Sequence, residues 1–284
     1  MQRRDFLASI GSAIALSQLG CARQIVTGSP GTRQLKRVGI QLYTLRDDAR
    51  RDLTGTLTNI AAAGYKEVEL LSSFRNFGMP PKDLRALLDR LGLRAPSTHV
   101  GADAFDNLSR EIDEALTLGH DYIVLASLPG DQRKLDDYRR WADRLNEAGR
   151  LTRQRGVWIA FHDEAYDFPR IDGQVPYDVL VQHTDPSVVR LQLDTGNATI
   201  GGVNPLDLMK QYGDRYWLFH IKDAPRLGAE SDTELGKGIV DFRALLGSID
   251  RIDEKHLYVE QESYPGAPLD SVKRDYAYLA NLKF

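Results

Sequence analysis

The chain has one cysteine, no excess of basic residues and no long apolar run, and each absence excludes a class of protein. Among its 284 residues only Cys21 is a cysteine, which excludes a fold held by intramolecular disulfides. Lys and Arg number 37 and Asp and Glu number 40, so the formal net charge of −3 lacks the basic excess typical of nucleic-acid binders. The apolar run near the N-terminus is too short for a comfortable membrane span. With 42% hydrophobic and 27% charged residues, the composition is that of a globular protein with one large core.

The first residues resemble a twin-arginine export signal. Residues 3–7 read RRDFL, which matches the R-R-x-F-L motif, and a short apolar run without acidic residues follows. Cys21 follows a glycine as in lipoprotein cleavage sites, although Gln18 stands where such sites usually have Leu. We expect residues 1–35 to be an export signal and linker and the protein to be periplasmic. A lipid on Cys21 is the one way in which it could be attached to a membrane. The alternative is an unprocessed cytoplasmic N-terminal helix.

Residues 36–284 alternate strand-like and helix-like segments, which predicts βαβ units around a parallel sheet. Strands are expected at 38–42, 66–70, 93–99, 121–125, 157–161, 189–193, 217–221 and 256–259. Helices are expected at 53–63, 81–91, 108–118, 133–155, 177–183, 205–212, from 241 to at least 246, and at 268–282. Eight such pairs predict an α/β protein with one domain, a (β/α)₈ TIM barrel.

Four of the expected strands lead into side chains that bind metals. Asp194 follows one strand, His220 ends the next, Glu260 follows the last, and the strand at 157–161 leads into His162 and Glu164. Because strand ends converge at one mouth of a barrel, these side chains can meet without being close in sequence. Mixed carboxylate and imidazole ligands suit divalent Mn, Co, Mg or Zn.

Each ligand assignment has an alternative. Asp194 could be the N-cap of a following helix, although we expect the next residues, TGN, to form a turn instead. A lone histidine after an apolar run, such as His220, is more often a packed core residue. Glu262 lies two residues beyond Glu260 on the same strand face and is the alternative to it.

Several motifs resemble the sugar phosphate isomerase/epimerase family, which has a xylose isomerase-like barrel and includes tagatose-type 3-epimerases and myo-inosose dehydratases. They are LQLDTGN at 191–197, HIKDA at 220–224, LGKGIVDF at 235–242 and YVEQE at 258–262. The resemblance implies one divalent metal held by Glu164, Asp194, His220 and Glu260. Many relatives have YHNHxxEF where residues 161–168 read FHDEAYDF, so the fourth ligand stays open between Glu164, His162 and Asp167, in that order of preference. With Glu164 as the ligand, His162 is expected to face the substrate.

Five further residues are candidates for contact with the substrate. His99 ends the third expected strand, where it could meet substrate or be a satisfied core histidine. Lys222 shares a strand face with the predicted histidine ligand, so it could stabilise an enolate oxygen or move a proton, the alternative being a surface salt bridge. Glu69 could act as a base or bind hydroxyls, and Tyr43 and Gln41 could contact the sugar. The Gly-rich loop at 224–238 could be a lid or a solvated loop.

The chemistry that this resemblance implies is abstraction of a proton next to a carbonyl, with Glu164 and Glu260 as the acid–base residues. Return of the proton to the other face gives epimerisation, its transfer to the next carbon gives isomerisation, and loss of a β-substituent gives elimination. We expect an isomerase or epimerase of a keto sugar. A 3-keto-glycoside lyase or hydrolase, or a dehydratase, is the alternative.

Two other function classes are less favoured by the sequence. An abasic-site endonuclease on this scaffold would need more metal ligands and a less acidic balance of charge. A periplasmic sugar-binding protein without chemistry would not need an acid on both sides of the metal. No strong phosphate-binding loop is present, so a free sugar or a keto-glycoside is the expected partner rather than a sugar phosphate or a nucleic acid.

Overall fold

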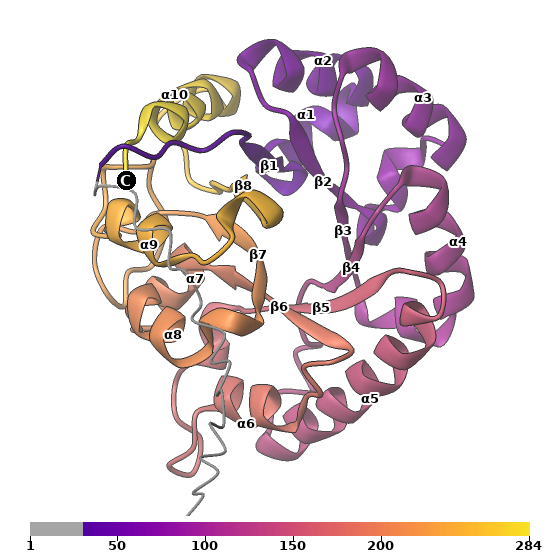
Figure 1. Cartoon of the computed structure of the whole chain (residues 1–284), viewed down its shortest axis with the longest axis vertical. Coiled ribbons are helices and arrows are strands. Elements are labelled where there is room, and N and C mark those ends of the chain that lie inside the picture. The colour runs from indigo at the N-terminus through magenta and orange to yellow at the C-terminus, as the bar shows by residue number, and fades with distance from the viewer. Residues whose placement is uncertain (1–30) are drawn as a thin grey trace, which may run out of the picture.

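A closed barrel of eight parallel strands forms the centre of the computed structural model, which describes residues 31–284 (Figure 1). The predicted export signal and Cys21 lie outside the described residues. The strands are β1 Gly39–Gln41, β2 Glu67–Leu71, β3 Ser97–Val100, β4 Tyr122–Leu125, β5 Trp158–His162, β6 Val189–Asp194, β7 Tyr216–Ile221 and β8 His256–Val259. They pair in sequence order, and β1 pairs with β8 to close the ring, so the predicted TIM barrel is confirmed.

The helices form an outer ring around the strands (Figure 1). They are α1 Arg46–Arg51, α2 Leu53–Ala63, α3 Pro81–Leu91, α4 Leu108–Leu118, α5 Leu135–Arg153, α6 Pro176–His183, α7 Thr195–Ile200, α8 Pro205–Tyr212, α9 Phe242–Ser248 and α10 Pro268–Asn281. Short 3₁₀ helices are η1 Leu42–Leu45, η2 Ser72–Gly78, η3 Ala102–Asp106, η4 Ala165–Asp167, η5 Gly213–Arg215 and η6 Ile252–Glu254. Within residues 31–284 none of the helices combines the length and the apolar character that crossing a bilayer requires.

Glycines in the left-handed conformation follow helices α2 and α3. Gly64 follows α2 with φ at 113° and Gly92 follows α3 with φ at 65°, both in the left-handed region that favours glycine. A Cβ on Gly64 would also lie 2.4 Å from the Tyr276 ring of α10, so only a residue without a side chain lets α2 end there. The turn returns the chain to the start of β2.

Side chains that point into the barrel are mostly polar, whereas those on the outer face of the strands are apolar and pack against the helices. At the end where the strands begin, the guanidinium of Arg190 lies between the rings of Trp158 and Trp217, 4.0 and 4.4 Å from their centroids. These rings and a small apolar cluster around Tyr122 and Tyr258 fill the lower barrel. The ligand-type side chains that the sequence selected lie at the other end, where the strands finish.

One carboxylate anchors the long loop between β7 and α9. Asp223 accepts hydrogen bonds from the backbone N–H groups of Ala224, Gly236, Gly238 and Val240, at 2.9 to 3.2 Å. A Cβ on Gly238 would lie 2.2 Å from Asp223 Oδ1, which explains the glycine there. The predicted alternatives were a lid and a solvated loop, and the loop is tied to the end of β7 along most of its length.

Candidate metal centre

Three ligand-type side chains meet at the C-terminal ends of β6, β7 and β8. Donor atoms of Asp194, His220 and Glu260 all lie within 4.8 Å of one another, and all three residues are buried. The strand register explains the cluster, because Asp194 lies opposite His220, and His220 lies opposite Tyr258, two residues before Glu260. Side chains two positions apart on a strand share a face, so the three side chains turn to the same point.

Asp194 divides its two oxygens between the backbone and the cluster. Its Oδ1 accepts 2.8 Å hydrogen bonds from the N–H groups of Gly196 and Asn197, so it is the N-cap of α7. The TGN segment, for which we predicted a turn, is the first turn of this helix, and that prediction was wrong. The capping alternative and the metal assignment are compatible, because Oδ2 faces His220 Nδ1 at 3.6 Å.

His220 lies between two carboxylates. Its Nδ1 is 2.9 Å from Glu260 Oε2 and its Nε2 is 2.6 Å from Glu69 Oε2. Burial opposes a charge on the ring, yet the carboxylates of Glu260, Asp194 and Glu69 raise the pKa of His220 well above its ordinary value. A cation that binds Nδ1 therefore takes the place of a proton.

Lys222 places a buried ammonium group at the edge of the cluster. Its Nζ lies 2.6 Å from Glu262 Oε1, 3.3 Å from Asn197 Oδ1, 3.4 Å from Glu260 Oε2 and 3.5 Å from Asp194 Oδ2. Although burial opposes the charge, these carboxylates raise the pKa of Lys222 well above its ordinary value. The expected alternative, a surface salt bridge to Asp223, does not form. Glu262, the alternative ligand, is the partner of this lysine.

Glu164 lies beside the three-residue cluster and is not part of it. Its Oε2 is 3.4 Å from Asn197 Nδ2, and burial raises the pKa of Glu164 to about 8, although nearby Lys222 opposes this shift. Asp167 is turned elsewhere, because it accepts hydrogen bonds from the Tyr138 hydroxyl at 2.5 Å and the Glu164 N–H at 2.8 Å. Burial raises the pKa of Asp167 to about 7. Glu164 thus holds a proton at neutral pH, and a fourth ligand stays a prediction.

Two neutral imidazoles face His220 across the barrel mouth. The rings of His99 and His162 lie 5.1 and 4.6 Å from the His220 ring, centroid to centroid. Burial lowers the pKa of His99 and, more strongly, that of His162, so both are neutral near pH 7. His162 Nδ1 is buried without a hydrogen-bond partner, whereas His99 Nε2 is 2.7 Å from Gln192 Oε1. His162 is thus the imidazole with an unused polar atom at the mouth.

The three other predicted substrate contacts lie deeper or further out. Glu69 is completely buried below the cluster, and Gln41 donates a 2.7 Å hydrogen bond to it. Tyr43 is half-buried at the rim, where its ring lies 6.0 Å from that of Phe74 and under the Arg46 guanidinium at 4.2 Å. Among its described contacts none joins Tyr43 to the cluster.

The structure adds three residues that the sequence analysis did not select. Asn197 Nδ2 donates to Asp163 O at 3.1 Å, and its Oδ1 accepts from Lys222. Asp163 accepts the Asp194 N–H at 2.9 Å, and burial with the nearby Asp194 charge raises the pKa of Asp163 well above its ordinary value. Gln192 donates to Glu69. Strand alternation could have placed Gln192, two residues before Asp194, on the inner face.

The donor set fits a divalent cation. Two carboxylates and one imidazole form a buried mixed oxygen and nitrogen set, the type that Mn, Co, Mg and Zn accept. The ordered partners of each ligand also fit: Asp194 is held by backbone N–H groups and His220 by Glu69. His162, whose Nδ1 has no hydrogen-bond partner, packs with its ring 4.6 Å from that of His220. We therefore treat the cluster as a candidate metal centre.

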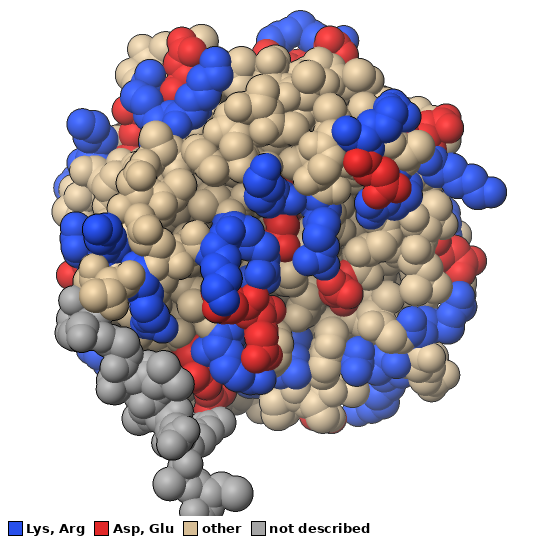
Figure 2. Space-filling view, turned by 45° about the horizontal axis from the view of Figure 1, so that its top comes forward, with Lys and Arg blue, Asp and Glu red and all other residues tan. Residues whose placement is uncertain are grey.

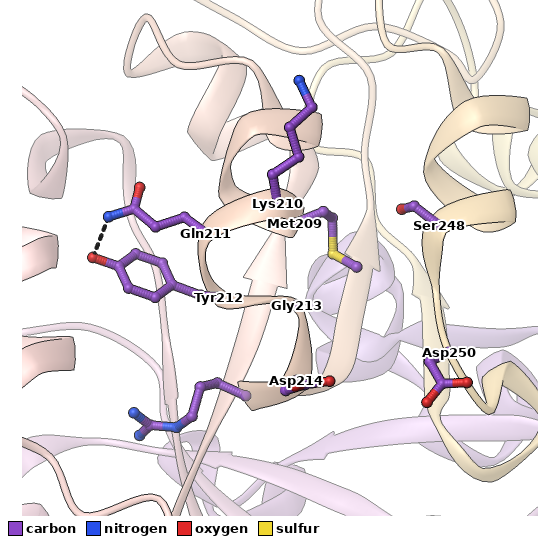
Figure 3. A pocket seen from close by; sticks show the side chains of 9 residues that line it. Met209, Lys210, Gln211, Tyr212, Gly213, Asp214, Ser248 and Asp250 are labelled. Atoms are coloured by element: carbon purple, nitrogen blue, oxygen red, sulfur yellow. Dashed lines mark hydrogen bonds between the residues drawn. The ribbon is translucent and has the colours of Figure 1, made fainter. Parts of the chain in front are cut away.

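A separate pocket lies at the opposite end of the barrel (Figure 3). It is lined by the end of α8 and the following turn, residues 209–215, and by Ser248 and Asp250 before β8. Gln211 Nε2 donates to the Tyr212 hydroxyl at its edge. The pocket therefore opens where the strands begin and has no part in the cluster.

The face in Figure 2 carries basic side chains beside acidic ones rather than one continuous charged patch.

Comparisons with known proteins identify the family of the barrel. Residues 57–282 match the family described as xylose isomerase-like TIM barrel. The chain is 28% identical over 192 residues to the inosose dehydratase of Geobacillus kaustophilus, covering 59% of this chain and 60% of that protein. It is also 28% identical over 251 residues to the inosose dehydratase of Clostridium beijerinckii, covering 74% of this chain and 82% of that protein.

Solved structures share the fold. A sugar phosphate isomerase/epimerase from Parabacteroides distasonis superposes with a TM-score of 0.76 at 20% identity, covering 86% of this chain and 98% of that one. The IolI protein, whose structure holds a zinc atom, superposes with a TM-score of 0.64 at 16% identity, covering 85% and 95%. At these identities the superpositions establish the barrel and no more.

Proposed function

The chain belongs to the xylose isomerase-like TIM barrel family, and from this premise we propose that it is a metal-dependent isomerase or epimerase of a keto sugar. The observation that carries the proposal is an acid–base pair at the candidate metal centre, made of buried Glu260, which belongs to the centre, and half-buried Glu164 beside it. Glu260 comes from β8 and Glu164 follows β5, so the two carboxyl groups approach the centre from different strands of the barrel. Such a pair can remove a proton from one carbon and return it elsewhere.

The two carboxyl groups differ in protonation. Burial alone would raise the pKa of Glu260, but Lys222 and His220 hold it well below its ordinary value, so this residue is a carboxylate and can take a proton. Glu164 is protonated at neutral pH and can give one. A divalent ion held by Asp194, His220 and Glu260 would supply a Lewis acid that acidifies the C–H next to a carbonyl.

Lys222 and the imidazoles of His99 and His162 can bind and orient the substrate in the proposed reaction. The Lys222 ammonium group is buried within 3.5 Å of two of the ligand oxygens, so it can donate to an oxygen that gains negative charge during proton removal. His162 and His99 are neutral and can each donate and accept hydrogen bonds, which suits sugar hydroxyls. Together they orient a polyhydroxylated ring over the acid–base pair.

Acidic groups on the β7 and β8 side of the mouth support an uncharged substrate. Glu262 pairs with Lys222, and the Glu262 N–H donates to Asp232 Oδ2 at 2.5 Å. Loops after the seventh and eighth strands are where TIM barrels commonly bind phosphate. Carboxylates there repel a phosphate, so we propose a free keto sugar or keto-glycoside rather than a sugar phosphate.

Elimination is the second candidate, and one observation favours it. The two relatives compared above by sequence are inosose dehydratases. A protonated Glu164 could give its proton to a leaving hydroxyl or glycosidic oxygen as readily as to carbon. The same carboxylate and acid would then produce dehydration of a keto-cyclitol or cleavage of a 3-keto-glycoside.

Proton exchange in heavy water tests the proposal. The protein is loaded with Mn²⁺ and incubated in deuterium oxide with a ketohexose, an inosose and a 3-keto-glucoside, and the products are read by NMR and mass spectrometry. We expect deuterium at the carbon next to the carbonyl, with a new epimer or isomer. Loss of water or of an aglycone would select elimination instead.

The control variant is Asp241→Asn, which changes a helix cap remote from the centre and should exchange normally. Mn²⁺ binding without exchange or product on all three substrates would refute enolisation.

We also propose export by the twin-arginine route, which the RRDFL motif supports and which suits a free-sugar substrate. Fractionation of cells that express the full chain and an Arg3→Lys, Arg4→Lys variant tests this. Periplasmic protein only from the unchanged chain would support export, and equal cytoplasmic retention of both would contradict it.

A further inference from the structure

Glu69 is a buried carboxylate that the proposed chemistry does not use. It lies on β2, completely buried, and contacts five side chains from four other strands, β1, β3, β6 and β7. Its Oε1 accepts from Ser97 Oγ at 2.6 Å, and its Oε2 accepts from Gln41 Nε2 at 2.7 Å and from His220 Nε2 at 2.6 Å. Gln192 Nε2 lies 3.0 Å from both oxygens, and His99 Nε2 lies 3.2 Å from Oε2.

These partners leave Glu69 no capacity for a substrate. A carboxylate offers about four lone-pair directions, and five side chains already donate to Glu69 or lie within reach of it. A sugar hydroxyl would have to displace one of them from a site without exposure to solvent. If Glu69 has a part in the site, it must therefore act through one of the side chains that it contacts.

The contact with His220 fixes which nitrogen of that ring faces the centre. Because an ionised carboxylate only accepts hydrogen bonds, His220 Nε2 carries the hydrogen that Glu69 accepts. Nδ1 is then the nitrogen on the side of the other ligands, 2.9 Å from Glu260 Oε2 and 3.6 Å from Asp194 Oδ2. Carboxylates that bond the second nitrogen of a metal-binding histidine fix its tautomer and orientation.

We propose that Glu69 is a positioning residue that holds His220 so that Nδ1 binds a divalent cation together with Asp194 and Glu260. The inference rests on the metal centre of the proposed function and does not depend on which reaction follows. The observation behind it is the contact between Glu69 on β2 and His220 on β7, two residues that lie 151 positions apart in the chain and meet across the barrel.

Two variants separate this role from general support of the barrel. Glu69→Gln is nearly isosteric, but its amide N–H₂ must face a donor whichever way it turns. Ser97→Ala removes a donor from Glu69 Oε1 and leaves the His220 contact intact, so it is the matched control. Mn²⁺ affinity is measured by calorimetric titration of chelator-treated full-length protein, and circular dichroism with thermal melting checks the fold.

We expect Glu69→Gln to bind Mn²⁺ about 10 to 100 times more weakly than the unchanged protein, and Ser97→Ala to bind it normally. Glu69→Asp keeps the charge but reaches less far, and should fall between them. A folded Glu69→Gln protein with unchanged affinity would overturn the inference, as would an equal loss in Ser97→Ala.

A measurement on the unchanged chain covers the case in which Glu69→Gln does not fold. Nitrogen-15 NMR of the zinc-loaded protein reports which histidine nitrogen binds the metal and which keeps its hydrogen. Zinc on Nδ1 of His220 with a hydrogen on Nε2 supports the inference, and zinc on Nε2 overturns it. If the unchanged protein binds the metal normally but exchanges no deuterium, the proposed function is refuted and the role of Glu69 is not. If Glu69→Gln binds Mn²⁺ with unchanged affinity while the unchanged protein exchanges deuterium normally, the role of Glu69 is refuted and the proposed function is not.

Discussion

Replacing Asp194 by Asn separates two roles that one side chain combines. Oδ1 caps α7 through the N–H groups of Gly196 and Asn197, and Oδ2 faces His220 and Lys222. Asn caps helices about as well as Asp. Its second polar atom is an N–H₂ group, which cannot bind a cation. We therefore expect Asp194→Asn to keep the helix cap and to lose the metal site.

The sizes of the two effects can be estimated separately. Partners of metal ligands contribute about 10 to 100-fold to affinity, so loss of a charged ligand should weaken Mn²⁺ binding by more than about 100-fold, or ~2.7 kcal/mol. Asp194→Ala loses the cap as well, which adds about 1 kcal/mol of destabilisation. For a chain of this size that difference lowers the melting temperature by about 2–4 °C. Both variants remove the same charge, so the difference between them isolates the cap.

Calorimetric titration with Mn²⁺ and thermal unfolding in chelator measure the two effects. Asp241→Ala is the matched control, because Asp241 caps α9 through the Ala244 N–H at 3.0 Å and lies outside the cluster. It should lose stability like the alanine variant at Asp194 and bind Mn²⁺ normally. Undiminished affinity in Asp194→Asn would refute the ligand assignment, and equal melting temperatures for the two Asp194 variants would refute the separation of roles.

Three further predictions follow from buried charges. Lys222→Met removes an ammonium group within 3.5 Å of Asp194 and Glu260, so Mn²⁺ affinity should rise at least about tenfold, and unchanged affinity in the same titration would contradict this. Because burial raises the pKa of Glu164 to about 8 from an ordinary 4.5, its contribution to stability is full below pH 4.5 and is lost as the pH rises through 8. Between pH 4.5 and 8 the urea midpoint of the unchanged protein in chelator should fall more steeply with pH than that of Glu164→Gln. An equal dependence on pH in the two proteins would exclude the raised pKa of Glu164. Asp223→Ala should accelerate amide hydrogen exchange across residues 224–241, and protection at the original rates would show that other contacts hold the loop.

The alternation of strand and helix patterns was enough to predict the barrel, and its failures have physical causes. The helices expected at 53–63, 108–118 and 205–212 coincide with α2, α4 and α8. The third strand was expected at 93–99 but is Ser97–Val100, because Pro96 has no N–H for a strand ladder. Helix α7 was missed because its Thr- and Gly-rich sequence has low helix propensity, which the Asp194 cap and burial of residues 195–199 override.

Those members of the candidate site that a single sequence rule can place were predictable. Ligand-type residues at strand ends identified Asp194, His220 and Glu260, because every strand of a parallel barrel finishes at the same mouth. The role of Glu69 was beyond such reasoning, since no spacing rule connects it to a histidine on a strand across the barrel. Glu164 was selected by its motif, but its retained proton comes from burial, which a sequence does not report.

Buried charge in the upper barrel explains why the site and the fold depend on each other. Asp194 uses one oxygen to start a helix and the other to face the centre, while Glu69 hydrogen-bonds side chains from four other strands, His220 among them. A buried ionic group that loses its partner is far more costly than the intact pair is stabilising. Each of these buried side chains therefore fixes the position of the next, from Gln41 through Glu69 and His220 to Glu260. We therefore expect changes in the loops at the rim to disturb the barrel less than changes at its centre, and folds that keep their centre can vary their function through such loops.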